Sequence, residues 1–252
     1  MAQIIAILNQ KGGVGKTTTV INLAAYLSKQ GKTVLVVDAD PQANATSGLG
    51  IAKSQSVHTT YQVLLGLVDI EKAILPTEFA DIYILPADSN LAGAETELAD
   101  KTGREAMLRG ALENINYDYI LVDCPPALGL LTINALVAAN WLLIPVQAEY
   151  YAMEGLGQLM DVFGRIREGL NPAINLLGIV ITMYDSRTSL AVQVVKQLEQ
   201  HFSSALFKTR IPRNIRLAEA PSYGKPISEH DKWSKGARAY KQLAKEVIQR
   251  VQ

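Results

Sequence analysis

A glycine-rich segment stands between an apolar run and a helical pattern near the start of the chain. Residues 9–19 read Asn-Gln-Lys-Gly-Gly-Val-Gly-Lys-Thr-Thr-Thr and directly follow the apolar residues 4–8. Residues 18–29 carry apolar side chains at helical spacing. Because glycines have no Cβ, their backbone N–H groups can converge on one ligand, and the N-terminus of the following helix adds partial positive charge. The segment therefore predicts a buried strand, a triphosphate-binding loop and a helix in succession.

This loop departs from the general nucleotide-binding pattern at one position. The pattern has a glycine five residues before Gly15, where this chain has Gln10 followed by Lys11. We expect Lys16 to reach the β- and γ-phosphates and Thr17 to bind Mg²⁺ through its hydroxyl. A tight glycine turn without a ligand is the alternative. The other residues expected to line the nucleotide are Lys11, Gly12, Gly13, Val14, Gly15 and Thr18.

Composition places the chain among globular proteins. It has 252 residues, of which 48% are hydrophobic and 19% charged, and we expect one α/β domain over residues 1–252. No apolar run approaches the roughly 20 residues that span a membrane, and the loop begins too early to leave room for a signal peptide. A single cysteine, Cys124, excludes an internal disulfide framework. We therefore expect a cytoplasmic protein.

The charges are unevenly distributed, although the net charge is zero. Residues 38–118 contain 5 Lys and Arg against 13 Asp and Glu, whereas residues 208–252 contain 11 against 4. A basic C-terminal segment attracts phosphate backbones if its charges share a face. The alternative is a solvated helix surface that balances the acidic region.

Apolar runs and helical patterns alternate along the chain. This alternation predicts an α/β fold, with a doubly wound and mainly parallel sheet, helices on both faces and ligands beyond the carboxyl ends of the strands. The expected strands are residues 4–8, 34–38, 82–86, 119–123, 141–146, 176–183 and 206–211. The expected helices are residues 16–30, 91–99, 103–115, 131–139, 152–168, 189–202 and 234–251.

Aspartates follow two of these strands at the same edge of the predicted sheet. Asp38 and Asp40 follow the second strand, and Asp123 follows four apolar residues in the Walker B arrangement. We expect Asp38 to support the water shell of Mg²⁺ and Asp40 to orient or deprotonate an attacking water. Asp123 would complete the magnesium shell together with Thr17. A helix-capping turn is the alternative for Asp38 and Asp40, and Cys124 is interpreted as a small buried residue.

Six strings resemble, in order, the ParA/Soj family of DNA-partitioning ATPases, which are P-loop NTPases of the deviant Walker A type. They are KGGVGKTTTVINLA, VDADPQANATSGLG, YILVDCPPALG, PVQAEYYAMEG, TMYDSRT and IPRNIRLAEAPSYGKPI. The phosphate loop and the Asp38/Asp40 pair are shared with relatives such as the division-site protein MinD and the nitrogenase iron protein. The segments DPQAN and IPRN with RLAEAPS are typical of partition proteins. Larger plasmid members carry an N-terminal helix-turn-helix domain, which we do not expect here because the loop starts at Lys11.

The resemblance implies a cycle that depends on ATP and Mg²⁺. Lys11 would reach the phosphates of the other subunit, so that two nucleotides lie inside a homodimer, and the expected catalytic residues are Lys11, Lys16 and Asp40. Gly12 would be small because the partner's loop approaches closely. The ATP-bound dimer would bind double-stranded DNA without sequence preference, and a ParB/Spo0J-type centromere-binding protein would stimulate hydrolysis. The implied location is the cytoplasm, in association with the nucleoid.

Family position also implies contacts to DNA and adenine. Arg187 and Arg216 are the expected DNA phosphate contacts, each with a local ion pair, to Asp185 and Glu219 respectively, as the alternative. Less certain DNA contacts are Lys225, Lys232, Lys235 and Arg238. The expected adenine-pocket residues are Pro212, Arg213 and Asn214, while Gln147, Glu149 and Tyr151 are expected at the dimer interface or the pocket. Trp141 and Trp233 are interpreted as packing residues.

Other functions remain as alternatives. A MinD-like membrane-cycling ATPase needs a C-terminal amphipathic anchor, but the modest apolar face of residues 237–251 favours core packing, and we expect no stable membrane association. An iron–sulfur carrier needs paired cysteines, which the chain lacks. A DNA-binding scaffold without enzymatic activity would leave ATP intact, whereas Asp40 and Asp123 favour catalysis. ParA-like positioning of a protein cargo fits the same motifs as DNA partition.

Overall fold

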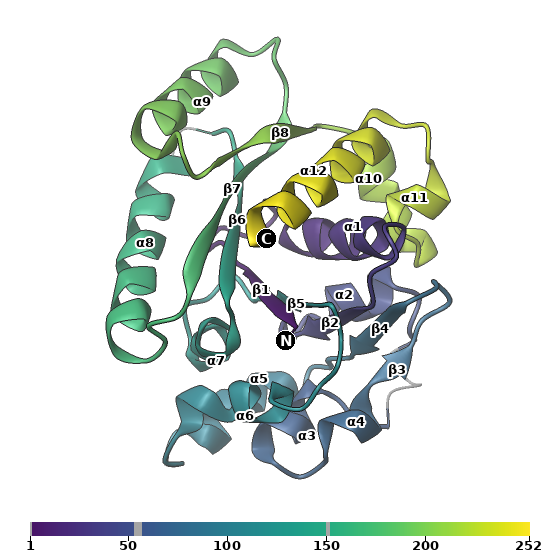
Figure 1. Ribbon diagram of the computed structural model, residues 1–252, viewed down its shortest axis with the longest axis vertical. Helices are drawn as coiled ribbons and strands as arrows, with labels where there is room; N and C mark the ends of the chain where they lie inside the picture. The colour runs from purple at the N-terminus through teal and green to yellow at the C-terminus, as the bar shows by residue number, and fades with distance from the viewer. Residues whose placement is uncertain (1, 53–56, 150–151) are drawn as a thin grey trace.

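A central sheet organises the computed structural model, which describes residues 2–52, 57–149 and 152–252. Its eight strands lie in the order β3-β4-β2-β5-β1-β6-β7-β8 (Figure 1). Among the described strands, only the short β3 pairs with its neighbour in the antiparallel direction, and the other pairs are parallel. The strands are β1 (Gln3–Ile7), β2 (Val34–Asp38), β3 (Leu75–Pro76), β4 (Ile82–Leu85), β5 (Tyr119–Asp123), β6 (Trp141–Gln147), β7 (Asn175–Tyr184) and β8 (Leu206–Pro212).

The central strands are buried on both faces. Every residue of β2 and of β5 is buried, which explains why these segments read as continuous apolar runs. Successive side chains point to opposite faces, so Ile5 and Ile7 enter one core while Ala6 enters the other. The predicted doubly wound α/β fold is confirmed.

Helices cover both faces of the sheet (Figure 1). Helices α1 and α12 pack against one face, and α5 to α9 line the other core. The longer helices are α1 (Lys16–Ser28), α5 (Leu91–Leu98), α7 (Leu130–Ala138), α8 (Ala152–Gly169), α9 (Ser189–Phe202) and α12 (Lys235–Val251). The shorter ones are α2 (Asn44–Gly48), α3 (Thr60–Leu65), α4 (Ile70–Ala73), η2 (Arg104–Ala106), α6 (Met107–Leu112), α10 (Ile215–Glu219), η3 (Ala220–Tyr223) and α11 (Ile227–His230).

Two details differ from the sequence-based expectation. The predicted helix over residues 103–115 is divided into η2 and the shorter α6. The elements α2, α3, α4, β3, α10, η3 and α11 were not predicted, because segments of two to six residues do not complete a periodic pattern.

The C-terminal helix packs into the core. Its buried residues include Tyr240, Leu243 and Val247, which confirms the packing interpretation of this face. Among the described residues no helix is both long and apolar enough to cross a membrane.

The packing interpretation of Trp233 is wrong, because its side chain is 79% exposed. Trp233 lies in the turn before α12, where its backbone N–H donates to Asp231 and the Lys232 ammonium lies over its ring. Trp141 is partly buried and donates from its indole nitrogen to Gln3 at 2.8 Å, so it does pack against the core.

Candidate nucleotide site

The candidate site lies at the carboxyl ends of the central strands. β1 stands where the strand order divides, with β5 and β2 on one side and β6 to β8 on the other. The register places Asp123 beside Asp38 and beside Ile7. The chain between β1 and α1 therefore starts next to both aspartates, at the position where doubly wound sheets bind ligands.

The predicted phosphate loop joins β1 to α1. Gly13 and Gly15 have φ angles of 75° and 89°, a left-handed conformation that a side chain would strain. The loop is fastened to neighbouring strands, since Asn9 donates its amide to the Pro145 carbonyl at 2.7 Å and the Thr182 hydroxyl donates to the Val14 carbonyl at 2.7 Å. The loop is thus held in place directly before the N-terminus of α1, an arrangement suited to binding phosphate.

Lys16 is buried at the start of α1. Its ammonium lies 3.4 Å from the Lys11 carbonyl, and its side chain points into the same region as three acidic or thiol groups. Burial lowers the pKa of Lys16, while the carboxylates of Asp123 and Asp40 and the Cys124 thiol act in the opposite direction. A ligand that brings negative charge would favour the charged form of this lysine.

Asp38 is fully buried and held by hydrogen bonds. Its Oδ2 accepts from the Thr46 backbone at 2.8 Å and from the Thr46 hydroxyl at 2.7 Å, and its Oδ1 accepts from the Asp40 backbone at 3.2 Å. Burial nevertheless raises the pKa of Asp38 to about 6. The hydrogen bonds fix the orientation of the carboxylate without compensating its desolvation.

Asp123 lacks the hydrogen bonds that hold Asp38. Both of its carboxylate oxygens are buried and neither has a hydrogen-bond partner of normal geometry among the described residues. Burial and the nearby Asp38 raise the pKa of Asp123 well above its usual range, although Thr17 and Lys16 favour the ionised form. Such an orphaned carboxylate beside a phosphate loop fits a site for a hydrated cation.

Magnesium fits this donor set through water and phosphate oxygens. The described residues hold no group of three or more His, Cys, Asp or Glu side chains that could enclose a metal. Mg²⁺ keeps several waters and is usually held by one or two carboxylates together with substrate phosphates. Thr17, Asp38 and Asp123 are the residues that would hold it here.

Asp40 is buried in the turn that follows β2. Its Oδ1 accepts from the Gln42 backbone at 2.9 Å, which stabilises the turn after β2. The side chain is 7% exposed and lies near Lys16 and Asp123. Asp40 thus holds a turn after β2, whereas the N-cap residue of α2 is Ala43.

A cavity of about 340 Å³ adjoins the phosphate loop. Its wall includes Gly15 and Thr18 from the loop and the first turn of α1, and Pro212, Arg213 and Asn214 from the chain after β8. The Asn214 side chain also caps α10 by accepting from the Leu217 backbone at 3.3 Å. The structure thus brings the three predicted adenine-pocket residues to the loop, within one cavity.

Several residues of this site were not assigned a role from the sequence. Thr46 fixes Asp38, Thr182 fixes the loop, and Tyr240 accepts or donates a hydrogen bond with Thr19 at 3.2 Å at the base of the cavity. The available signal was a hydroxyl residue within an otherwise apolar run, which applies to Thr182. No comparable signal distinguishes Thr46, which lies in a short polar helix.

The comparisons with known proteins agree with this geometry. A family described as an AAA domain matches residues 2–176. The sporulation initiation inhibitor protein Soj of Bacillus subtilis is 51% identical over 98% of this chain and 98% of its own length. The chromosome-partitioning ATPase Soj of Thermus thermophilus is 54% identical over 98% of this chain and 96% of its own. The chain belongs to the ParA/Soj family of partitioning ATPases.

A solved structure gives the same fold with a nucleotide. The cobyrinic acid a,c-diamide synthase of Mycobacterium smegmatis, with a bound ATP analogue and magnesium, is 36% identical and has a TM-score of 0.87. The match covers 99% of this chain and 95% of that one. A ParA/Soj-type chain is thus similar in fold to a protein that holds an ATP analogue and Mg²⁺.

The ParA/Soj signature lysine, Lys11, is paired within its own chain. Its ammonium forms an ion pair with Glu149, and Glu149 also accepts from the Gln147 amide at 2.5 Å. Both partners of the ion pair are about half exposed. Tyr151, expected in the same region, lies outside the described residues.

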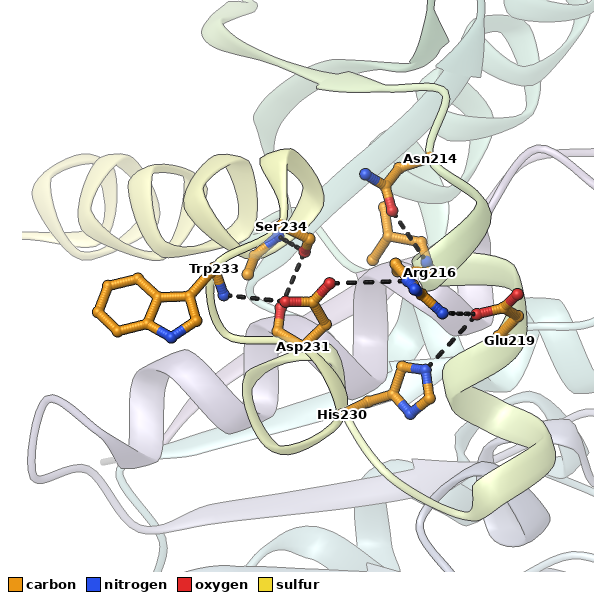
Figure 2. A network of polar contacts seen from close by, with 9 residues as sticks. Asn214, Arg216, Glu219, His230, Asp231, Trp233 and Ser234 are labelled. Carbon is orange, nitrogen blue, oxygen red and sulfur yellow. Dashed lines mark hydrogen bonds and ion pairs between the residues drawn. The ribbon is translucent and has the colours of Figure 1, made fainter.

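The two arginines expected to contact DNA are also in local ion pairs. Arg187 is 87% exposed and donates to both oxygens of Asp185, at 2.9 and 2.7 Å, which holds the pKa of Asp185 well below its usual range. Arg216 donates to Glu219 at 2.9 Å and lies 3.7 Å from Asp231. Figure 2 shows Arg216 between these two carboxylates. The local ion pairs offered as alternatives are therefore present.

The less certain DNA candidates have a different environment. They are exposed, and within the described chain none of them forms an ion pair with a carboxylate: Lys225, Lys232, Lys235 and Arg238.

Proposed function

We propose that this protein is a Mg²⁺-dependent ATPase that partitions DNA through an ATP-bound sandwich dimer. The observation that carries the ATPase proposal is the orphaned Asp123 carboxylate beside Asp38 and the buried Lys16. Within the described residues Lys16 offsets only part of the negative charge of these carboxylates. Bound Mg²⁺ would pair with the carboxylates, and the phosphates would pair with Lys16. Family membership supports the partition role.

The residues at the loop would divide the work of hydrolysis. The loop amides and Lys16 bind the phosphates, and Thr17, Asp38 and Asp123 hold the magnesium shell. Bound magnesium would neutralise charge that develops on the phosphate oxygens. Asp40 orients the attacking water, because its carboxylate sits in a turn that its own bond to the Gln42 backbone keeps in place.

The environment of Gly12 supports the proposal of a dimer. Unlike Gly13 and Gly15 it has no positive φ angle, and a Cβ added to it would meet no atom of the described residues within 4 Å. Nothing in the described part of the monomer therefore requires glycine at this exposed position. A partner loop that approaches closely would require it.

Dimer formation would exchange the partner of Lys11. In the monomer its ammonium is paired with Glu149, and in the dimer it would bind the phosphates of the other subunit. The exchange replaces one half-exposed ion pair with a stronger contact to a multiply charged anion.

The dimer would bind duplex DNA without sequence preference, through Arg187 and Arg216. The less certain contacts are Lys225, Lys232, Lys235 and Arg238. Dimerisation doubles every phosphate contact, and log affinity falls with log salt by about 0.9 per neutralised phosphate. Two weakly basic faces can therefore bind together where one does not. We further propose a ParB/Spo0J-type stimulating partner and a cytoplasmic, nucleoid-associated location.

Gel filtration and fluorescence anisotropy of labelled duplex DNA test this function, each with ADP and with a slowly hydrolysed ATP analogue. We expect a monomer with ADP and a DNA-binding dimer with the analogue. Gly12→Val should bind both nucleotides and remain monomeric, whereas Gly110→Val, at another position open to solvent, serves as the matched control. Equal DNA binding with no nucleotide, ADP and the analogue would contradict the proposal.

A further inference from the structure

Glu95, on the α5 helix, lies against the start of α7. Its Oε1 accepts a hydrogen bond from the Leu131 backbone at 3.2 Å, so it caps a helix to which it does not belong. Gly129, the N-cap residue of α7, has no capping side chain of its own. Glu95 therefore satisfies one of the unpaired N–H groups in the first turn of this nine-residue helix.

The absence of a side chain at Gly129 makes room for this carboxylate. A Cβ at Gly129 would clash with Oε1 of Glu95 and lie 3.0 Å from Oε2. The φ angle of Gly129 is −86°, so its backbone conformation is open to any residue. Glycine at this position is explained by the carboxylate that occupies the space.

Helix α7 also holds the segment that follows the magnesium-site aspartate. Residues 124–129, the post-Asp123 loop, connect β5 to α7, and the Thr132 hydroxyl of α7 donates to the Ala127 carbonyl at 2.6 Å. Pro125 and Pro126 stiffen the first part of this loop. Because this connection is short and stiff, a movement of Gly129 would also move the residues next to Asp123.

Cys124, the first residue of this loop, donates its backbone N–H to the Ile7 carbonyl at 3.3 Å, so the loop starts beside the end of β1, directly before the phosphate loop. We infer that Glu95 is a positioning residue that holds the post-Asp123 loop in the placement needed to engage the γ-phosphate. The inference rests on the proposed ATP-dependent dimer. A carboxylate at a helix N-terminus is favourable for the helix dipole, and a loop fixed in advance does not have to be ordered when ATP binds. ADP has no γ-phosphate, so its affinity in the absence of Mg²⁺ should not depend on this loop.

Three variants and one control separate this role from general stability. Glu95→Ala removes the cap, Glu95→Gln keeps an acceptor oxygen, and Gly129→Ala displaces the carboxylate with a methyl group. Glu97→Ala is the matched control, because Glu97 lies on the same helix and accepts from the Tyr61 hydroxyl at 2.8 Å instead. Since Glu95→Ala and Gly129→Ala remove the same contact, the double variant should be no worse than either single one.

Hydrogen–deuterium exchange of the nucleotide-free protein tests the contact without reference to the dimer. We expect the amides of residues 127–133 to exchange about five- to tenfold faster in Glu95→Ala and in Gly129→Ala, the size of losing one helix cap. Glu95→Gln and Glu97→Ala should exchange like the wild type in this segment. Unchanged exchange in both of the first two variants would overturn the inference.

Dimerisation and ADP titration test the consequence. With the slowly hydrolysed analogue, Glu95→Ala should dimerise about five- to tenfold more weakly, with recovery in Glu95→Gln and with ADP affinity, measured without Mg²⁺, unchanged. An equal loss of ADP affinity, an additive double variant or the same defect in Glu97→Ala would overturn the positioning role. If the wild type does not dimerise with the analogue, the proposed function itself fails, and the exchange experiment still decides whether Glu95 holds the loop.

Discussion

The phosphate loop region differs from the arginine surface, that is, the exposed Arg187 and Arg216, in how its charges are paired. At the loop, the Asp123 carboxylate is buried with no hydrogen-bond partner of normal geometry among the described residues, and Lys16 is buried among acidic groups. At the surface, Arg187 and Arg216 are exposed and each is already paired with carboxylates of its own chain. The first region is incomplete without a ligand, whereas the second is electrostatically satisfied as it stands.

This contrast shows how far geometry alone supports each ligand. A buried charge without a partner costs several kcal/mol by general estimates, so its presence implies something that compensates it. An exposed ion pair contributes little and breaks readily, so it neither requires a ligand nor excludes one. The nucleotide proposal therefore rests on the structure, while the DNA proposal rests chiefly on family membership and on charge.

Removing Lys16 should have the largest effect. We expect Lys16→Ala to lower ATP turnover by about 10³-fold, because it removes the main cation at the phosphates. A phosphate-release assay and a nucleotide titration measure the change. Lys29→Ala, at the exposed end of α1, is the control and should turn over ATP normally. Normal turnover by Lys16→Ala would mean that the loop is not the nucleotide site.

Asp40→Ala should separate binding from hydrolysis. We expect turnover to fall by about 10²-fold, while the ATP-bound dimer persists and still binds DNA, because the variant loses the group that orients water. Gel filtration after incubation with ATP, combined with phosphate release, detects this state. Rapid hydrolysis by the variant would reject the role of Asp40, and Asp69→Ala controls for loss of an exposed carboxylate.

Asp123→Asn should make the nucleotide-free protein more stable and less active. A neutral amide in place of an orphaned buried carboxylate should raise the free energy of unfolding at pH 7.5 by about 1–3 kcal/mol. Denaturant unfolding at several pH values measures this, with phosphate release alongside. A loss of stability would show that Asp123 is stabilised by the chain and does not await a cation.

The wild-type stability should also depend on pH. Because the folded-state pKa of Asp38 is raised to about 6, the folded protein binds this proton more tightly than the unfolded chain does. The contribution of Asp38 to stability is therefore greatest below about pH 4, the ordinary pKa of aspartate, and is lost as the pH rises through about 6. Other titrating groups add their own slopes, so the comparison is with Asp38→Asn, which should lose this component. An identical pH profile in the variant would contradict the raised pKa.

The sequence predicted the regular parts of the molecule better than its contacts. Buried strands such as Val34–Asp38 and Tyr119–Asp123 carry their own apolar signal, and they were predicted with their observed bounds. The cap that Glu95 provides to α7, and the exposure of Trp233, depend on how distant segments meet and leave no periodic trace in the chain. Arg187 and Arg216 were placed near local acids as an alternative, since their partners are two or three residues away. The roles of the site residues and the single domain over residues 1–252 stay predictions.

Charge removal at the arginine surface should weaken DNA binding without affecting the dimer. Each arginine occurs twice in the dimer, so Arg187→Ala or Arg216→Ala should reduce the slope of log affinity against log salt by about two. Anisotropy titrations at several salt concentrations measure the slope, and Arg109→Ala, an exposed arginine in the acidic half, is the control. A monomeric variant would show instead that the arginine supports the interface.

Glu219→Gln should have the smallest effect and tests the arginine surface most directly. If Arg216 must leave Glu219 to contact a phosphate, the neutral amide removes a competitor, and DNA affinity should rise about two- to fourfold at low salt, the modest effect expected of an exposed ion pair. The gain should shrink at high salt, because screening weakens the competing pair as well. Glu113→Gln, in the acidic segment of residues 38–118, controls for the change in net charge. Weaker binding by Glu219→Gln would reverse the interpretation, because Glu219 would then hold the Arg216 guanidinium in the orientation that DNA needs. The arginine surface, like the phosphate loop, would in that case be arranged for its ligand before binding.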